Sequence, residues 1–180
     1  MTSSSPEEQP AALQLEARKK IFDVVRKNAG CHFREIQRVA GLSFGSASYH
    51  LSYLKKHQLI KEETDGKNIR YFPLNFPVKN EKLLMLLRQR SVRTILLFIF
   101  GCEGGTHQQI ASSVKLSPST VTWHLKKLLD NGIIQSGKQG RYKRYFLCIP
   151  KGEIMDLLIS YKESFFDSLV DGVIELWERS

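Results

Sequence analysis

An internal repeat constrains the fold of this chain more than any other feature of its sequence. When the sequence is shifted by 74 residues, the segment 36–72 aligns with the segment 110–146 without a gap, and eleven of the 37 aligned pairs are identical. The run "RYF" at 70–72, for example, recurs at 144–146. A repeat at a fixed spacing indicates that one structural unit occurs twice in tandem, and 180 residues are enough for two small domains.

Each copy predicts the same series of secondary-structure elements. For the first and second copy respectively, these are a leading helix (12–28, 91–100), a short helix (33–40, 107–114), a longer helix (within 42–60, and 117–131) and a hairpin with a Gly-containing tip (65–66, 137–141). In the second copy, Ser117 suits the N-cap of the longer helix, Pro118 its first turn and Gly132 a left-handed C-terminal cap. This series is that of a winged helix-turn-helix domain.

The expected fold class is therefore mainly α with small β wings (α+β), with two winged helix-turn-helix domains in tandem. The predicted organisation is a disordered polar tail (1–11), a first winged-helix domain (12–78), a linker helix (79–90), a second winged-helix domain (91–150) and a C-terminal amphipathic helix (151–180). Apolar spacing predicts which side chains of the helices point inward: Ile21, Val24, Val25, Ala47, Leu51, Leu54, Val92, Ile95, Leu96, Ile99, Val121, Leu125 and Leu128.

The second copy contains "LSPSTVTWHLKKLLDNGII" followed by "GRYKRYFL", which resembles the winged-helix DNA-binding domains of ArsR- and MarR-type regulators. With "GCHFREI" and "YHLSYLKKHQLI…IRYF" in the first copy, the chain is similar to double winged-helix regulators found in archaea. The resemblance covers about residues 12–150 and implies a transcriptional regulator that binds double-stranded DNA. Winged helices also bind proteins, so the alternative is an interaction module in a transcription, chromosome-organising or membrane-remodelling complex.

The charge distribution agrees with a polyanionic partner. The net charge is +9 overall, but residues 81–152 hold 12 Lys and Arg against 3 Asp and Glu, whereas residues 153–180 hold 2 against 7. A basic body with an acidic C-terminal segment favours binding to a polyanion through the body.

The outward face of helix 117–131 suits the major groove of DNA, because short hydroxyls near its start can reach bases and cations further along can reach phosphates. An outward tryptophan also suggests contact with a sugar, a thymine methyl group or another protein. The helical period places one set of residues outward or on the flanks: Ser119, Thr120, Thr122, Trp123, Lys126 and Lys127.

The wing of the second copy adds four cations, Lys138, Arg141, Lys143 and Arg144. Side chains alternate along a strand, so Lys143 and Arg144 point in opposite directions and not all four can meet one surface. Lys138 and Arg141, at the tip, are the stronger candidates for phosphate contacts.

The first copy is less suited to phosphate. Ser52 and Tyr53 replace the two central lysines of the second copy, and Glu62, Glu63 and Asp65 lie beside the wing cations. The second copy is therefore expected to be the stronger DNA reader, and the first is left open as a DNA or a protein contact. Its candidate residues are Ser46, Ser48, Tyr49, Ser52, Tyr53, Lys56, Lys67 and Arg70.

The C-terminal segment 153–178 has apolar residues at steps of three and four, which predicts a helix with one long apolar stripe. Such a helix either covers its own core or pairs with a second chain. Since related regulators dimerise through such helices, a homodimer is favoured, through Leu158, Tyr161, Phe165, Leu169, Val173 and Leu176.

The remaining features argue against other classes of protein. We find no catalytic constellation, phosphate loop, zinc-ligand spacing or apolar run long enough to span a membrane, so we expect no enzyme, cofactor, metal site or membrane contact, and a cytoplasmic location. Cys31 and Cys102 are expected to be small buried hydrophobes rather than redox-sensing thiols. His50 and His124, beside the inward stripes, are expected to be half-buried and bonded to the backbone.

Overall fold

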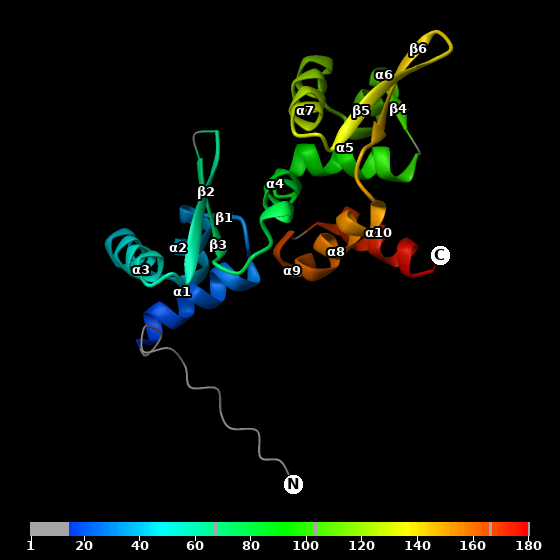
Figure 1. Ribbon diagram of the computed structural model, residues 1–180. Coiled ribbons are helices and arrows are strands. Elements are labelled where there is room, and N and C mark those ends of the chain that lie inside the picture. The colour runs from blue at the N-terminus through cyan, green and yellow to red at the C-terminus, as the bar shows by residue number, and fades with distance from the viewer. Residues whose placement is uncertain (1–14, 67, 103, 166, 180) are drawn as a thin grey trace. The chain divides into compact units, whose positions relative to one another are not determined.

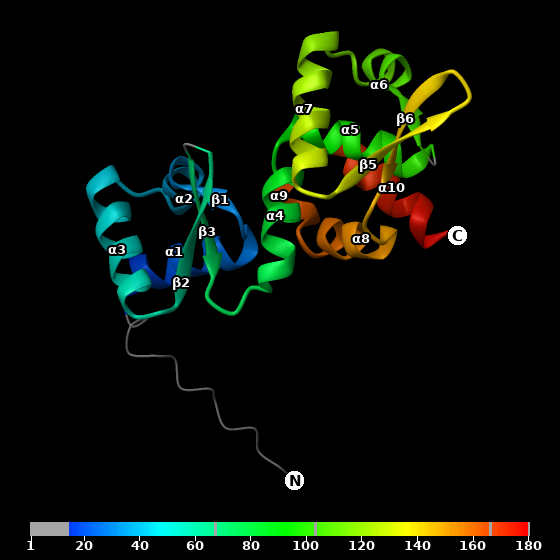
Figure 2. The ribbon, with the colours of Figure 1, turned by 45° about the horizontal axis from the view of Figure 1, so that its top comes forward.

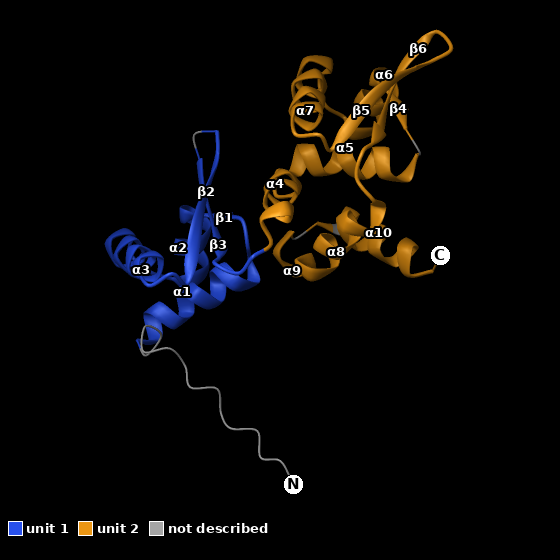
Figure 3. Cartoon of the chain, viewed as in Figure 1, with its two compact units in different colours: residues 1–76 blue, residues 77–180 orange. Residues whose placement is uncertain are grey.

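The chain forms two compact units, Met1–Phe76 and Pro77–Ser180 (Figure 3). The structure, a computed structural model, describes residues 15–66, 68–102, 104–165 and 167–179 (Figure 1). The polar tail expected at 1–11 lies outside the described residues.

Unit 1 is a three-helix assembly with a small antiparallel sheet whose hairpin projects from it as a wing (Figures 1 and 2). Strand β3 lies between β1 and β2, in the order β1-β3-β2. The elements are α1 (Glu16–Lys27), β1 (Cys31–His32), α2 (Phe33–Ala40), α3 (Phe44–Lys56), β2 (Ile60–Asp65) and β3 (Asn68–Pro73).

Unit 2 repeats this series and adds helices at both ends. The repeated elements are α5 (Arg90–Gly101), β4 (Gly105–Thr106), α6 (His107–Val114), α7 (Pro118–Asp130), β5 (Ile134–Gln139) and β6 (Tyr142–Leu147), with sheet order β4-β6-β5. The added helices are α4 (Val78–Leu87), α8 (Lys151–Ser160), α9 (Lys162–Phe165) and α10 (Ser168–Glu178). Every element from α5 to β6 begins and ends 74 residues after its counterpart in unit 1. Two tandem winged helix-turn-helix domains of α+β class are confirmed. The two-residue strands β1 and β4 were not predicted.

The ends of the helices follow from the capping residues. Ser117 Oγ accepts a hydrogen bond from the backbone N–H of Thr120 at 3.3 Å, and Thr106 and Gln109 form a capping box at the start of α6. Gly132 has the predicted left-handed conformation, with φ of 66°. Its counterpart in unit 1, Gln58, adopts the same conformation, with φ of 55°, although it is not a glycine. The turn therefore has the same backbone geometry in both units, even where a non-glycine residue is strained by it.

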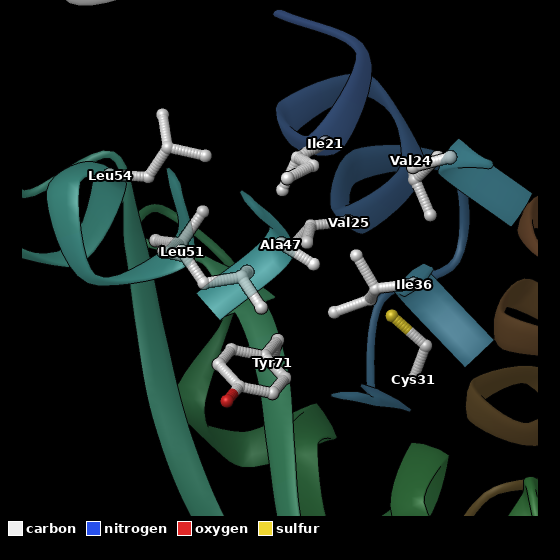
Figure 4. Packing of buried hydrophobic residues seen from close by; sticks show 11 residues of the cluster. Ile21, Val24, Val25, Cys31, Ile36, Ala47, Leu51, Leu54 and Tyr71 are labelled. Carbon is white, nitrogen blue, oxygen red and sulfur yellow. The ribbon is translucent and has the colours of Figure 1, made fainter. Parts of the chain in front are cut away.

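The helical periodicity identified the cores correctly. All thirteen residues predicted to point inward are buried. In unit 1, Figure 4 shows Ile21 and Val25 of α1, Ile36 of α2 and Ala47 of α3 converging, with the ring of Tyr71 below them. Cys31 is buried as expected, whereas Cys102 is exposed, because it is the C-cap of α5 and lies beyond the helix face that packs on the core.

The linker helix expected at 79–90 corresponds to α4, which is part of unit 2. Its second half is buried, with Leu84 and Leu87 both 0% exposed. At its end, Arg88 donates a hydrogen bond from Nη2 to Ser164 Oγ at 3.1 Å, which ties α4 to the C-terminal segment of the same unit.

The prediction of a single C-terminal helix from the apolar stripe is wrong. The segment forms three helices, α8, α9 and α10. Gly172, which interrupts the stripe, lies inside α10 and does not break it. The chain instead leaves α8 at Tyr161 and forms the short α9. It begins α10 after Asp167, whose carboxylate accepts the backbone N–H of Leu169 at 3.2 Å as an N-cap.

A buried ion pair holds the start of α10 to α5. The side chains of Arg93 and Asp167 are 4% and 5% exposed, and Arg93 Nε donates to Asp167 Oδ2 at 3.0 Å. Arg93 also donates from Nη1 to the carbonyl of Leu87 at 2.6 Å and lies 5.1 Å from the ring centre of Phe165. The C-terminal segment therefore covers the core of unit 2 through specific polar contacts as well as apolar ones.

Candidate nucleic-acid interface

The outward face of α7 is exposed as predicted. Trp123 is 60% exposed, and Ser119, Thr122 and Lys126 are exposed on the same side of the helix, opposite the buried Val121 and Leu128. Thr120 is half-buried. The face offers a convex helical surface of the size that enters a major groove.

The hydroxyls of this face already have partners within unit 2. Thr122 Oγ1 donates to the carbonyl of Pro118 at 2.9 Å and lies 2.9 Å from His107 Nε2. Ser119 Oγ and Thr120 Oγ1 lie 3.1 Å and 2.8 Å from Ser117 Oγ. Direct hydrogen bonds to bases from these hydroxyls would compete with contacts that shape the start of the helix.

The indole of Trp123 is held in place by two neighbours on α7. The ring of His124 meets it edge-on at a centroid distance of 4.9 Å, and Lys127 Nζ lies 5.8 Å from the ring centre. Lys127 was predicted to face DNA, but it is half-buried and donates to Gln89 Oε1 at 3.2 Å. It is too close to α5 to lie on the outward face, so we assign it to positioning α7.

The wing of unit 2 is cationic along its length. Lys138, Arg141 and Lys143 are exposed, Arg144 is half-buried, and the segment Ile134–Leu147 contains no Asp or Glu. In the described part of the chain no ion pair involves these four cations. A groove of about 470 Å³ runs between residues 141–144 of the wing and residues 106–109 at the start of α6. A groove whose cations are not paired with carboxylates is suited to binding phosphate oxygens.

The corresponding face of unit 1 differs from the prediction at Tyr53. Tyr49 is 61% exposed and Ser52 and Lys56 are exposed, while Ser46 and Ser48 are half-buried. The half-buried ring of Tyr53, however, carries the guanidinium of Arg18 at 3.5 Å from its centre and stacks on His57. Tyr53 therefore packs toward α1 and is not available to a ligand on the outward face.

Two cations near the wing of unit 1, Arg70 and Lys55, are paired with carboxylates. Arg70, predicted to contact DNA, is 8% exposed, donates to the carbonyl of Gly30 at 3.3 Å and pairs with Asp65 at 3.5 Å. It lies on the central strand β3, between β1 and β2, which explains its burial. Lys55 pairs with Glu62 at 2.7 Å. Lys67 lies outside the described residues.

The groove between wing and helices also differs in chemistry between the units. In unit 1 it measures about 690 Å³, and its lining includes the apolar Phe33, Phe44 and Ile69 as well as Arg34 and Glu62. Phe44 is 67% exposed. The residues 74 positions after the three apolar ones are His107, Pro118 and Lys143. The sequence analysis did not single out Phe44 or Ile69. The alignment of the two copies could have identified Ile69, because it places this apolar residue opposite Lys143.

His50 and His124 occupy matching places on α3 and α7. Both are buried, but within the described structure neither Nδ1 has the backbone partner that was expected. Burial lowers the pKa of both imidazoles below the ordinary value, and the charges of Arg18 and Lys127 respectively lower it further. Both rings are therefore neutral packing groups near pH 7.

The residues predicted for dimerisation divide into two groups. Leu158 and Phe165 are buried within unit 2, and Tyr161 and Val173 are half-buried. Leu169 and Leu176 are 49% and 67% exposed on α10, next to Trp177 at 40%, which the sequence analysis did not select. The apolar stripe thus covers the unit's own core and leaves a smaller exposed set on α10.

Neither a metal site nor a membrane helix is found in the part of the chain that the structure describes. These residues contain no group of three or more His, Cys, Asp or Glu side chains placed to hold a metal ion. Among their helices, none has the length and apolar character to cross a membrane.

Comparison with known proteins finds helix-turn-helix (HTH) domains in both units. Residues 15–84 match a family model described as an N-terminal HTH domain, and residues 89–135 match one described as winged helix-turn-helix DNA-binding. Neither description names the ArsR or MarR group. The chain is also similar to an HTH-type transcriptional regulator of Methanocaldococcus jannaschii, 30% identical over 135 residues, which are 73% of this chain and 33% of the relative. The chain thus spans about a third of that relative's length, and these matches do not favour a protein-interaction scaffold.

Proposed function

We propose that this chain, with its two tandem winged helix-turn-helix domains, is a DNA-binding transcriptional regulator in which unit 2 is the stronger reader of duplex DNA. The observation that carries the proposal is the cationic, acid-free wing of unit 2, which forms a groove with the start of α6. The HTH matches in both units and the regulator from Methanocaldococcus jannaschii support the same function, which proceeds by binding rather than by catalysis.

In this proposal α7 enters the major groove while Lys126 and the wing cations contact phosphates on either side. Cations near the duplex release counterions from it, so each phosphate contact adds affinity that falls as salt rises. Unit 1 supplies fewer such contacts, because Arg70 and Lys55 are paired with carboxylates and Glu62 lines its groove beside the apolar side chains. Its contribution to duplex binding is therefore the smaller one.

Duplex binding by the full chain at two salt concentrations tests the proposal. Six phosphate contacts would give a slope of about −5 in log K against log salt, so affinity should fall about 1,000-fold between 50 and 200 mM salt. Fluorescence anisotropy with a labelled random-sequence duplex measures this slope. Absence of binding at 50 mM salt would contradict the proposed function.

We further propose that the chain is a homodimer in which the exposed face of α10 packs on a second copy. Leu169, Val173 and Leu176 lie at steps of four and three on this face. Trp177 lies beside them, with its ring 5.9 Å from that of Phe100, and Val170 and Ile174, further round the helix, are buried in unit 2. Exposed apolar residues at such spacing favour helix pairing between chains.

Leu176→Asp is expected to convert the dimer into a monomer of 20.7 kDa, because a charge would be buried in the pairing face. Sedimentation equilibrium measures the mass. Ile159→Asp is the matched control, since Ile159 on α8 is also exposed, at 46%, but lies outside the proposed face. A wild-type chain that sediments as a monomer at micromolar concentrations would refute the dimer.

A further inference from the structure

The geometry of α7 points to thymine as the base that this helix reads, with Trp123 contacting the C5-methyl group in the major groove. This inference rests on the proposed duplex binding and names the base that the same site recognises. It concerns specificity, which the phosphate contacts of the wing do not supply.

The first step is that α7 offers few groups for reading bases by hydrogen bonds. The helix "PSTVTWHLKKLLD" contains no Asn, Gln or Arg, so Lys126 and Lys127 are its side chains of the types that pair bidentately with adenine or guanine, and Lys127 is engaged with Gln89. The hydroxyl of Thr122 is held by the carbonyl of Pro118 and by His107, which leaves its methyl group for a ligand. Ser119 is likewise engaged with Ser117.

The second step is that the most exposed apolar group of this face has neighbours that favour one orientation of its ring. Trp123 is 60% exposed, and the ring of His124 and Lys127 Nζ lie 4.9 Å and 5.8 Å from the centre of its ring. Lys127 is itself anchored to Gln89 at 3.2 Å. An apolar ring that is oriented before binding loses little conformational freedom when it meets a ligand.

The third step is the chemistry of the groove. Among the four bases, thymine alone presents an apolar group, its C5-methyl, in the major groove. An indole ring and a threonine methyl are complementary to that group. Lys126, three residues beyond Trp123, is then left for a phosphate.

Replacing thymine by deoxyuridine tests the inference, because this removes the C5-methyl and leaves the Watson–Crick pairing intact. The probe is the duplex that the full chain enriches most from a random pool, remade with deoxyuridine at each thymine in turn. Wild type should lose affinity about fourfold at one to three adjacent positions, the fold-change that corresponds to one buried methyl group.

Trp123→Ala should bind the thymine and deoxyuridine duplexes equally, whereas Tyr49→Ala, at the matching exposed place on α3, should still discriminate at those positions. Circular dichroism checks that both variants fold, which their surface positions favour. Equal binding of thymine and deoxyuridine by wild type at every position overturns the thymine inference and leaves duplex binding standing. Enrichment of no duplex at 50 mM salt overturns the proposed function, and the inference with it.

Discussion

Replacing Lys138, Arg141 and Lys143 with alanine is expected to lower the affinity for duplex DNA about 100-fold at 0.15 M salt. These cations line the wing of unit 2, which has no acidic residue to compensate them. A slope of −0.9 per phosphate contact makes each contact worth about fivefold in affinity at this salt concentration. Three lost contacts should also reduce the slope of log K against log salt by about three.

The matched control removes the same charge from unit 1. Lys19, Lys20 and Lys27 are exposed on α1 and belong neither to α3 nor to the wing, and their replacement with alanine should change affinity by less than about threefold. Fluorescence anisotropy at four salt concentrations gives both affinity and slope. Equal losses in the two triple variants would show that net charge, and not the wing, determines binding.

The winged-helix fold was predictable from the sequence because the repeat encodes local geometry. Residues that fix helix ends and inward faces, such as Ser43 and Ser117 at the N-caps or Leu51 and Leu125 in the cores, recur at the same spacing. Each of these signals acts within a few residues. For this reason the predicted ends of α2 and α6 agree with the structure to the residue.

Contacts between distant residues could not be predicted in this way. Arg70 donates to the carbonyl of Gly30, 40 residues earlier, and Tyr53 packs under Arg18 of α1. Strand alternation and the helical period predict the direction in which a side chain points. They do not predict which residues of neighbouring elements that side chain meets. For this reason both residues were predicted to contact DNA, whereas their partners lie inside unit 1.

The break in the C-terminal helix has the same origin. The apolar stripe of 153–178 is continuous in sequence, but Asp167 is bound by Arg93, 74 residues earlier, and this contact fixes where α10 begins. The interior of unit 2 thus determines which apolar residues of the stripe are buried. It leaves Leu169 and Leu176 exposed and takes Leu158 and Phe165 into the core.

Asp167→Asn is expected to reduce the free energy of unfolding of unit 2 by about 3 kcal/mol. The change keeps the size of the side chain and removes the charge that Arg93 requires in a site where both side chains are nearly inaccessible. Breaking a buried pair by removing one partner costs about 3–5 kcal/mol, because the other charge stays buried and uncompensated. We expect the lower end, since Arg93 retains the carbonyl of Leu87 and the ring of Phe165.

Urea unfolding followed by tryptophan fluorescence isolates this effect, because the two tryptophans of the chain, Trp123 and Trp177, both lie in unit 2. Asp171→Asn is the matched control: the same chemical change in the same helix, at a pair with Lys162 whose side chains are 46% and 48% exposed. Surface pairs of this kind contribute less than about 1 kcal/mol. Equal losses in the two variants would show that the buried pair adds no net stability.

The same pair determines how unit 2 responds to acid. Burial raises the pKa of Asp167. This effect is outweighed by the hydrogen bonds from Arg93 and from the backbone N–H of Leu169, together with the charges of Arg93 and Arg90, so the pKa lies below its ordinary value of 3.8. A carboxyl group whose pKa is lower in the folded state stabilises that state fully above its unfolded pKa of about 3.9, and the contribution disappears as pH falls through the folded value. The stability difference between wild type and Asp167→Asn should therefore be constant from pH 7 to about pH 5 and shrink below about pH 4. A difference that stays constant down to pH 2 would mean that the carboxylate of Asp167 is not the group responsible.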